Sequence, residues 1–411
     1  MDISGLPARR AALKLLDAVA RRGETLDQAF HNAVQGISAD ADRALARAIA
    51  AETLRWQADL DALIDSATRM PLPEDAKARM VLRIMLAQWL RLGTPPHAVV
   101  ATGLALLTGG PRRLAHGVFS TLTRGGAALP PAPTLPPFVA ARWGERAPAI
   151  AAALGEPPLL DLSLRDPSET ARWTAELGGT SLAPGHVRLP RGDAIERLAG
   201  FADGAWWVQD LAAALPARLL GRGEGRRVLD LCAAPGGKTL QLAAAGWQVT
   251  ALDVSERRLA RLRDNLARCA LDAEVIVADA LEWEPEAPFD AILLDAPCSA
   301  TGTCRRHPDV LHRVTRDLIA TMAQLQSHLL TRASGWLAPG GRLVYAVCSL
   351  EREEGEEQAA QMDLALAPMP VQPDELPADL APTPEGWLRT DPGMLPGNGG
   401  MDGFFIARWQ R

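Results

Sequence analysis

Residues 226–242 read RRVLDLCAAPGGKTLQL, and this stretch decides the class of fold. It begins with an apolar run, passes through Pro235, Gly236 and Gly237, and ends with apolar residues at helical spacing. A strand, a glycine-rich turn and a helix in that order are the opening unit of a parallel α/β sheet. Because glycine lets the backbone approach a bound molecule closely, we expect a ligand at this turn.

From residue 226 onward, apolar runs alternate with helical patterns, which predicts a mostly parallel, Rossmann-like sheet. The expected strands are RRVLDLCA, WQVTALDV, EVIVADAL, FDAILLDAP and GGRLVYAVCS. The expected helices are GGKTLQLAAA, SERRLARLRDNLARCA, DLIATMAQLQSHLLTRASGWL and EREEGEEQAAQMD. We expect DGFFIARW, close to the C-terminus, to close the sheet as an edge strand.

The chain has 411 residues, which is too long for one ordinary core, and its patterns divide it into three parts. Residues 1–128 place apolar residues at helical spacing almost throughout, which predicts an all-α domain. A proline-rich linker, GGAALPPAPTLPP, follows at residues 125–137. Residues 138–220 mix strand and helix patterns and are expected to form a small α+β segment, and residues 221–411 form the α/β domain.

The composition is that of a globular protein, with 48% hydrophobic and 22% charged residues. No apolar run approaches the roughly 18–20 residues that a membrane span needs, and the N-terminus lacks the features of a secretory signal. We therefore expect a cytoplasmic protein without membrane contact. The five cysteines are an odd number in a long chain, which argues against a disulfide framework.

The net charge of −6 is unevenly distributed along the chain. Residues 1–130 carry 16 basic and 12 acidic side chains, a net of +4, whereas residues 351–411 carry 4 basic and 12 acidic side chains, a net of −8. Basic patches in the first part could meet phosphates, although ordinary solvated faces explain the charge equally well.

Three kinds of ligand compete for the glycine-rich turn. Gly237, Lys238 and Thr239 match the end of a phosphate-binding loop, but Cys232 stands where its first glycine belongs. The glycine pattern of a dinucleotide site is absent. S-adenosyl-L-methionine has no phosphate and needs only close backbone contact, so it is the third possibility.

Acidic residues at the strand ends favour the third ligand. Asp253 could accept both ribose hydroxyls, Asp279 could meet the adenine edge, and Asp295 follows the next strand. Arg258, on the helix after Asp253, could brace the ribose site or form a surface ion pair. Any one of these acids could instead cap a helix, but acids at successive strand ends fit hydroxyl, amino and sulfonium groups and do not fit a polyphosphate.

Two cysteines also stand at strand ends, Cys298 in DAPCSATG and Cys348 in YAVCSLE. Isolated cysteines are usually buried packing residues, which is how we interpret Cys269. The absence of a C-x-x-C pair and of a matching histidine pair argues against a metal site. A Cys–His nucleophile pair with His307 is possible, although no sequence feature enforces it.

Two thiols beside a methyl donor suggest methylation of cytosine at C5. C5 is a poor nucleophile until a thiolate adds to C6, which makes C5 able to attack the methyl group. A base must then remove the C5 proton. Asp295 lies three residues before Cys298, where it could hydrogen-bond to N3 and stabilise the adduct.

Several motifs occur in order: LDLCAAPGGKT, LDVSERRLARLRDNL, ADAL, FDAILLDAPCSATGTCRRHPDV, LQSHLL and LAPGGRLVYAVCSLEREEGEEQ. With them, about residues 140–411 resemble the RsmB/NOP2/Sun family of RNA (cytosine-5)-methyltransferases. The N-terminal RRAALKLLDAV, ETLRW, LRIMLAQWL and PPHAVVATGLALL resemble the NusB-type RNA-binding helical domain. This combination is typical of the bacterial RsmB branch, which modifies 16S ribosomal RNA.

The resemblance implies a role for each matching residue. Cys348, in the second Cys-Ser motif, is implied as the nucleophile, and Cys298 as the residue that assists release of the methylated RNA. Asp295 is implied as part of both the catalytic site and the cofactor site. The family's S-adenosyl-L-methionine site maps onto Cys232, Ala233, Ala234, Pro235, Gly236, Gly237, Lys238, Asp253, Arg258, Asp279 and Asp295. We expect an RNA substrate, no metal and a monomer.

The sequence departs from the family pattern at two positions. Val347 replaces the usual Thr or Ser before the nucleophile, and Gly355 replaces the Asn of a frequent Glu-Asn-Glu. Cys304 is expected to pack in the interior, and Arg305, Arg306 and His307 are expected to face RNA. The alternatives are a non-catalytic RNA-binding protein with a relic fold and a small-molecule methyltransferase, and both leave the paired cysteines unexplained.

Overall fold

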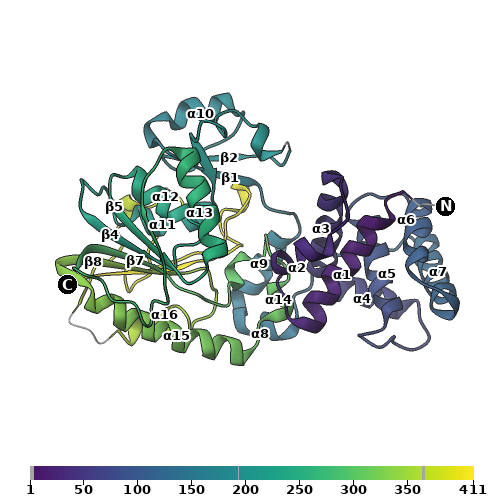
Figure 1. The fold of residues 1–411 in the computed structure, drawn as a ribbon. Coiled ribbons are helices and arrows are strands. Elements are labelled where there is room, and N and C mark those ends of the chain that lie inside the picture. The colour runs from purple at the N-terminus through teal and green to yellow at the C-terminus, as the bar shows by residue number, and fades with distance from the viewer. Residues whose placement is uncertain (1–3, 193, 363–365) are drawn as a thin grey trace. The chain divides into compact units, whose positions relative to one another are not determined.

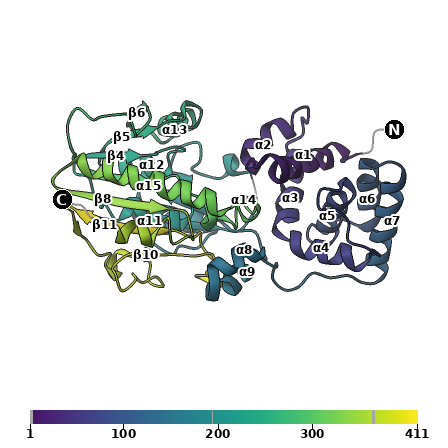
Figure 2. The same cartoon turned by 90° about the horizontal axis from the view of Figure 1, so that it is seen from below.

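The computed structural model describes residues 4–192, 194–362 and 366–411. It divides into two compact units, which are formed by residues Met1–Glu156 with Cys304–Val314, and by residues Pro157–Thr303 with Thr315–Arg411. Figures 1 and 2 show helices alone in the first unit and a mixed α/β architecture in the second. No helix within the described ranges is long and apolar enough to cross a membrane.

The first unit is a bundle of helices around a central one, α5. The bounds are α1 Leu6–Arg22, α2 Leu26–Ala33, α3 Asp40–Arg55, α4 Gln57–Ser66, α5 Lys77–Leu90, α6 Pro96–Gly103, α7 Gly109–Arg124, α8 Pro137–Trp143 and α9 Ala147–Leu154. Helix α5 is buried on nearly all sides, with Val81, Ile84 and Leu86 fully inaccessible, because its sequence is apolar around most of its circumference. Helix α2 starts at a capping box between Thr25 and Gln28.

A segment from later in the chain completes this helical unit. Residues 304–314, which include α14 (Val310–Arg313), pack with the N-terminal helices. Arg55 Nη2 donates to the Arg305 carbonyl over 3.1 Å, and Arg313 Nε donates to the Gly23 carbonyl over 2.8 Å. The expectation that Arg305 faces RNA is therefore wrong: Arg305 is 2% exposed, because its segment is part of the helical core.

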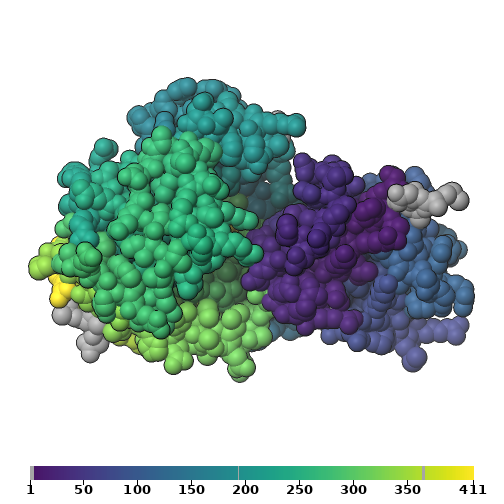
Figure 3. Space-filling view, viewed as in Figure 1, coloured from purple at the N-terminus to yellow at the C-terminus, as the bar shows by residue number. Residues whose placement is uncertain are grey.

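A small antiparallel sheet opens the second unit. Its strands are β1 Leu160–Leu164, β2 His186–Leu189 and β3 Trp206–Val208, in the order β2-β1-β3, with helix α10 (Thr170–Glu176) between β1 and β2. The buried Arg188 forms a bidentate pair with Asp161, with N–O distances of 2.6 and 2.7 Å. Arg268 of helix α13 (Glu256–Cys269) donates to the carbonyls of Phe201 and Trp206, so this segment adjoins the larger sheet. Figure 3 shows the continuous surface that results.

The larger sheet has the order β10-β11-β8-β7-β4-β5-β6, with β9 paired to β11. Its strands are β4 Arg227–Leu231, β5 Gln248–Asp253, β6 Glu274–Val277, β7 Phe289–Asp295, β8 Leu337–Val347, β9 Ala367–Pro368, β10 Leu388–Arg389 and β11 Phe405–Gln410. Strands β8, β7, β4, β5 and β6 are parallel, as predicted, and β11 is antiparallel to β8. The prediction of β11 as an edge strand is wrong, because the two-residue strand β10 pairs with its other side.

Helices cover both faces of this sheet, as Figure 1 shows. Helices α11 (Leu211–Arg218), α12 (Gly237–Ala244) and α13 pack on one face, and α15 (Arg316–Gly335) packs on the other. The chain proceeds outward from β4 to β6 on one side and continues with β7 and β8 on the other. The strand order therefore reverses between β4 and β7, and such a reversal opens a crevice for ligands at the carboxyl ends of the strands.

The helix predicted over residues 351–363 is much shorter in the structure. A turn occupies residues 351–355, helix α16 covers only Glu356–Ala360, and Asp363 lies outside the described residues. Gly355 has φ −114° and ψ −92°, which no helix contains. The side chain of Glu354 is buried against the strand ends, and this tertiary contact overrides the helix propensity of the segment.

Candidate functional site

The glycine-rich turn lies between β4 and α12, at the reversal point of the sheet. Cys232 and Gly236 have φ angles of 63° and 109°, so the backbone turns sharply on either side of Ala233. A Cβ atom at position 236 would lie 2.2 Å from Leu262 Cδ1, and only glycine fits this position. The turn therefore packs closely against α13 at Gly236, and its approach to a ligand stays a prediction.

Asp253 and Arg258 hold this turn in place. Asp253 ends β5 as predicted, and its carboxylate accepts hydrogen bonds from the N–H groups of Ala234 and Ser255, over 3.1 and 2.9 Å. Arg258 donates to the Ala234 carbonyl and lies 3.8 Å from Asp253 Oδ2. The structure thus brings together Ala234, Asp253 and Arg258, three of the residues predicted to bind the cofactor. Arg258 braces the turn itself, through the Ala234 carbonyl and the Asp253 carboxylate.

The neighbouring strand ends carry exposed apolar and acidic groups. Val254 is 68% exposed and Val277 is 46% exposed, beside the ends of β5 and β6. Asp279 is exposed and accepts a hydrogen bond from the Leu281 N–H, and within the described chain no hydrogen bond or ion pair joins it to the other predicted site residues. Exposed apolar surface beside carboxylates fits an adenine with a ribose and a sulfonium, whereas these carboxylates would repel a polyphosphate.

Lys238 and Asp295 form an ion pair between α12 and the end of β7. Their Nζ and Oδ2 atoms are 2.7 Å apart, and Lys238 Nζ lies 5.3 Å from the centre of the Phe404 ring. Burial lowers the pKa of Lys238, but Asp295, Cys348 and Asp230 together raise it, so the pKa is raised overall. The amine therefore stays positively charged at neutral pH. Lys238 was predicted as a cofactor residue and Asp295 as both a cofactor and a catalytic residue, and the structure joins them in an ion pair.

The two strand-end cysteines meet. Cys298 Sγ and Cys348 Sγ are 3.4 Å apart. The parallel register, in which Asp295 pairs with Ala346, places both cysteines just beyond the sheet, and the Gly302 N–H donates to the Cys348 carbonyl over 3.0 Å. The hydrogen bond with Cys348, burial and the nearby charge of Glu354 raise the pKa of Cys298 well above its usual value.

The other cysteines do not share this arrangement. Cys269 and Cys304 are fully buried, which confirms them as packing residues. His307 lies 3.6 Å from Asp27, within the helical unit that residues 304–314 complete. Burial lowers the pKa of His307. No hydrogen bond or ion pair joins His307 to Cys298 in the described part of the chain, so the structure gives no support to a Cys–His pair.

Sequence reasoning missed three residues beside the thiols: Ser299, Ser349 and Glu354. Each serine follows one of the two cysteines, and the Glu354 carboxylate accepts hydrogen bonds from both serine hydroxyls. The serine after each cysteine and the glutamate six residues after Cys348 were visible in the sequence. Their convergence depends on strand register and on the turn at residues 351–355.

The two departures from the family pattern have structural explanations. Val347 is fully buried in the apolar cluster of β7, β8 and α15, opposite Phe405. A Cβ atom at position 355 would lie 2.5 Å from Arg389 Nη2 and 2.8 Å from Phe405 Cγ, so this backbone accepts only glycine. The missing Asn therefore reflects close packing of Arg389 against the turn.

Asp230 lies beneath the glycine-rich turn and gives a prediction about stability. It is fully buried, Oδ2 accepts a 2.5 Å hydrogen bond from Thr239, and Oδ1 has no hydrogen-bond partner among the described residues. Burial raises its pKa to about 7. The folded protein then holds a proton that the unfolded chain releases near pH 4, so the free energy of unfolding falls by about 4 kcal/mol between pH 4 and 7.

Asp230→Asn is expected to remove this contribution, since the amide cannot ionise. Urea unfolding of both proteins at pH 5 and pH 8 would measure it: the variant gains stability relative to the wild type at pH 8. Asp264→Asn, at an exposed position on α13, is the matched control. Equal pH dependence in the wild type and Asp230→Asn would contradict the prediction.

Known proteins resemble this chain over nearly its whole length. The family model described as 16S rRNA methyltransferase RsmB/F matches residues 217–410, and the NusB family model matches residues 6–108. Proteins named ribosomal RNA small subunit methyltransferase B are 35% identical in Klebsiella pneumoniae, over 97% of both chains, and 36% identical in Xanthomonas campestris, over 98% of this chain and 97% of the relative.

Solved structures show the same fold. The crystal structure of PH0851 covers all of both chains with a TM-score of 0.73 at 22% identity. A methyltransferase homolog protein from Pyrococcus horikoshii covers 71% of this chain and 98% of its own, with a TM-score of 0.57 at 28% identity. The near-complete coverage of the relatives leads to one conclusion: the chain belongs to the RsmB/F family of S-adenosyl-L-methionine-dependent methyltransferases.

Proposed function

We propose that the protein methylates C5 of a cytosine in ribosomal RNA through a covalent bond between Cys348 Sγ and C6 of the base. The observation that carries this proposal is the 3.4 Å approach of two thiols beside the Lys238–Asp295 pair. A methyltransferase that acts on an oxygen or an exocyclic nitrogen needs no nucleophilic thiol. Cytosine C5 is a poor nucleophile, and addition of a thiolate to C6 activates it.

In the proposed reaction, the Cys348 thiolate adds to C6, and the electron pair of the C5–C6 bond moves toward C5. Asp295 contacts the N3 edge of the base and stabilises the proton that N3 takes up. S-adenosyl-L-methionine supplies the methyl group that C5 accepts. A base then removes the C5 proton, the C6–sulfur bond breaks, and the Cys348 thiolate is restored. Cys298, which lies beside Cys348, assists this release.

Ribosomal RNA is proposed as the substrate because the close relatives are named as small subunit rRNA methyltransferases. The helical unit and the small α+β segment are proposed to bind the RNA, and the protein to act as a cytoplasmic monomer without a metal ion. A cavity of about 510 Å³ between the α+β segment and the α/β domain is lined by Arg165, Arg218 and Arg222, and also by Asp374 and Glu375. Burial lowers the pKa of Arg218 to about 10, and a phosphate would compensate this desolvated charge.

Cys298→Ala tests the covalent step directly. If Cys298 assists release, the variant accumulates a protein–RNA complex that survives denaturing gel electrophoresis when it is mixed with ribosomal RNA and S-adenosyl-L-methionine. Cys269→Ser, at a buried cysteine on α13, is the control and accumulates no complex. A trapped complex with Cys348→Ala in place of Cys298→Ala would reverse the assignment of the two thiols.

A further inference from the structure

One buried carboxylate connects the two cysteine loops. Glu354 is fully buried, and its carboxylate accepts hydrogen bonds from the Ser299 N–H over 2.8 Å, from the Ser299 hydroxyl over 2.5 Å, and from the Ser349 hydroxyl. The two hydroxyl oxygens are 3.1 Å apart. Since Ser299 follows Cys298 and Ser349 follows Cys348, Glu354 fixes the spacing of the two thiols.

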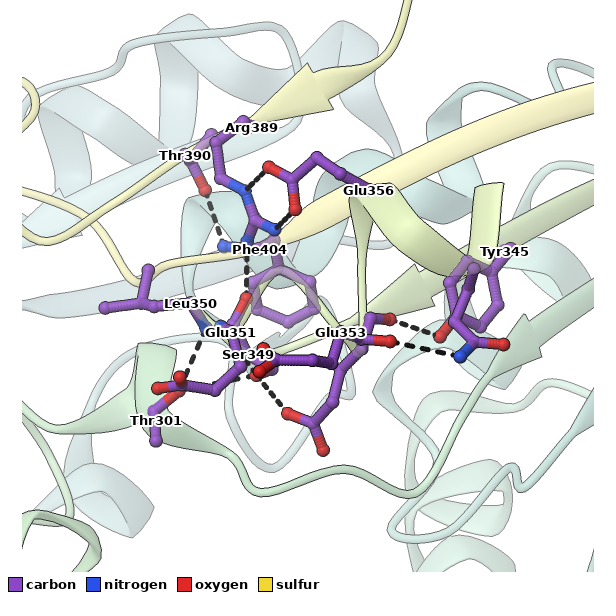
Figure 4. A network of polar contacts seen from close by, with 12 residues as sticks. Thr301, Tyr345, Ser349, Leu350, Glu351, Glu353, Glu356, Arg389, Thr390 and Phe404 are labelled. Atoms are coloured by element: carbon purple, nitrogen blue, oxygen red, sulfur yellow. Dashed lines mark hydrogen bonds and ion pairs between the residues drawn. The ribbon is translucent and has the colours of Figure 1, made fainter. Parts of the chain in front are cut away.

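Glu354 is itself held from several sides. The Tyr345 hydroxyl donates to the Glu354 carbonyl over 2.5 Å, and Gln326 of α15 donates to the Pro297 carbonyl over 2.8 Å. On the other side of Ser349, Arg389 donates to the Ser349 carbonyl and pairs with Glu356, as Figure 4 shows. The carboxylate therefore occupies one defined position relative to the loops.

Two charges of opposite sign flank the thiols. Burial raises the pKa of Glu354, and the hydrogen bonds from the two serines oppose that rise, because they favour the ionised form. Its charge, with that of Cys348, raises the pKa of Cys298. The charge of Cys348, with those of Asp295 and Asp230, raises the pKa of Lys238.

We propose that Glu354 is a positioning residue that assigns the nucleophilic role to Cys348, because its carboxylate accepts two hydrogen bonds from Ser299 in the Cys298 loop and one from Ser349 in the Cys348 loop. This inference rests on the proposed function, which makes Cys348 the nucleophile. It supplies a physical reason for the assignment, since both thiols stand at strand ends, precede a serine and lie 3.4 Å apart. Other charged and titratable groups near the thiols or near Lys238 and Glu354, among the described residues, include Asp230, Asp295, Tyr345, Glu351 and Arg389.

The test measures thiol reactivity in the full chain without RNA or cofactor. Iodoacetamide alkylation at pH 6 to 10, followed by peptide mass spectrometry, gives a rate for each cysteine. The wild type is expected to react faster at Cys348. Glu354→Gln keeps the side-chain shape and removes the charge, so the Cys348 to Cys298 rate ratio is expected to fall by about tenfold or more, since one pKa unit changes the thiolate fraction tenfold.

Three further variants complete the experiment. Glu354→Asp restores the charge and is expected to restore most of the ratio, which a purely structural role would not do. Glu357→Gln, at an exposed position on α16, is the matched control and leaves the ratio unchanged. Lys238→Gln removes the opposite charge and is expected to lower the ratio also, so it tests the proposal even where Glu354→Gln does not fold. An unchanged ratio in Glu354→Gln or Lys238→Gln overturns the proposal.

This readout separates the inference from the proposed function. Alkylation reports which thiol ionises first and is independent of any reaction with cytosine. If alkylation favours Cys348 in a charge-dependent way but the protein forms no RNA adduct, the proposed function is wrong and the role of Glu354 is supported. If the protein forms an adduct through Cys348 but Glu354→Gln leaves the alkylation ratio unchanged, the proposed function is supported and the role of Glu354 is wrong.

Discussion

Cys348→Ala is expected to lower methyl transfer to RNA by more than about 10⁴-fold and to abolish covalent complex formation, because it removes the sulfur that activates the base. Cys348 stands one residue beyond β8, with its backbone carbonyl fixed by the Gly302 N–H, so the loss of one sulfur atom leaves the loop in place. Transfer of tritiated methyl groups from S-adenosyl-L-methionine to ribosomal RNA measures the effect.

The control for this variant is its cofactor affinity. Cys348→Ala is expected to bind S-adenosyl-L-methionine as the wild type does, because the turn at Ala234 and the Asp253 carboxylate are unchanged. Equilibrium dialysis would establish this. Residual methylation within tenfold of the wild type would show that another group attacks C6, or that the acceptor atom needs no covalent activation.

Asp295→Asn is expected to lower the rate constant of methyl transfer by about 10²–10³-fold while RNA binding changes little. The amide nearly preserves the shape of the side chain but cannot hold the proton that N3 takes up, and it cannot form the ion pair with Lys238. Single-turnover kinetics with excess enzyme would separate the chemical step from RNA binding.

A double-mutant cycle with Lys238→Gln provides the control for Asp295→Asn. Because Lys238 Nζ and Asp295 Oδ2 are 2.7 Å apart, the double variant is expected to lose less than the sum of the two single effects. Additive effects would mean that the two side chains act separately and that the pair has no role in the chemistry.

The α/β domain was predictable because its strands carry their own pattern. Runs such as VLDL and AILL are buried on both faces of a covered parallel sheet and are apolar apart from Asp230, and each is followed by a turn and a helix. The two-residue strands β9 and β10 have no such pattern, since their pairing depends on β11, which lies beside them only in the folded chain. This is why β11 was taken for an edge strand.

The candidate site was likewise predictable only in part. Parallel strands end at one edge of the sheet, so the sequence alone predicted that Cys298 and Cys348 would lie near each other. The position of Glu354 could not be predicted, because helix propensity over EREEGEEQ points to a solvated helix. Arg305 was misjudged because a basic residue in a loop usually lies in solvent, whereas this loop is part of another unit's core.

That last feature bears on how the protein is made. The helices of the first 156 residues leave the ribosome first, but residues 304–314 contribute the buried Cys304, Arg305, Val310 and Leu311 to the same unit. During synthesis the helical unit therefore stays incomplete until about half of the methyltransferase sheet has been translated. The chain order therefore delays completion of the N-terminal unit, and an N-terminal fragment cut at residue 156 would lack part of its own interior.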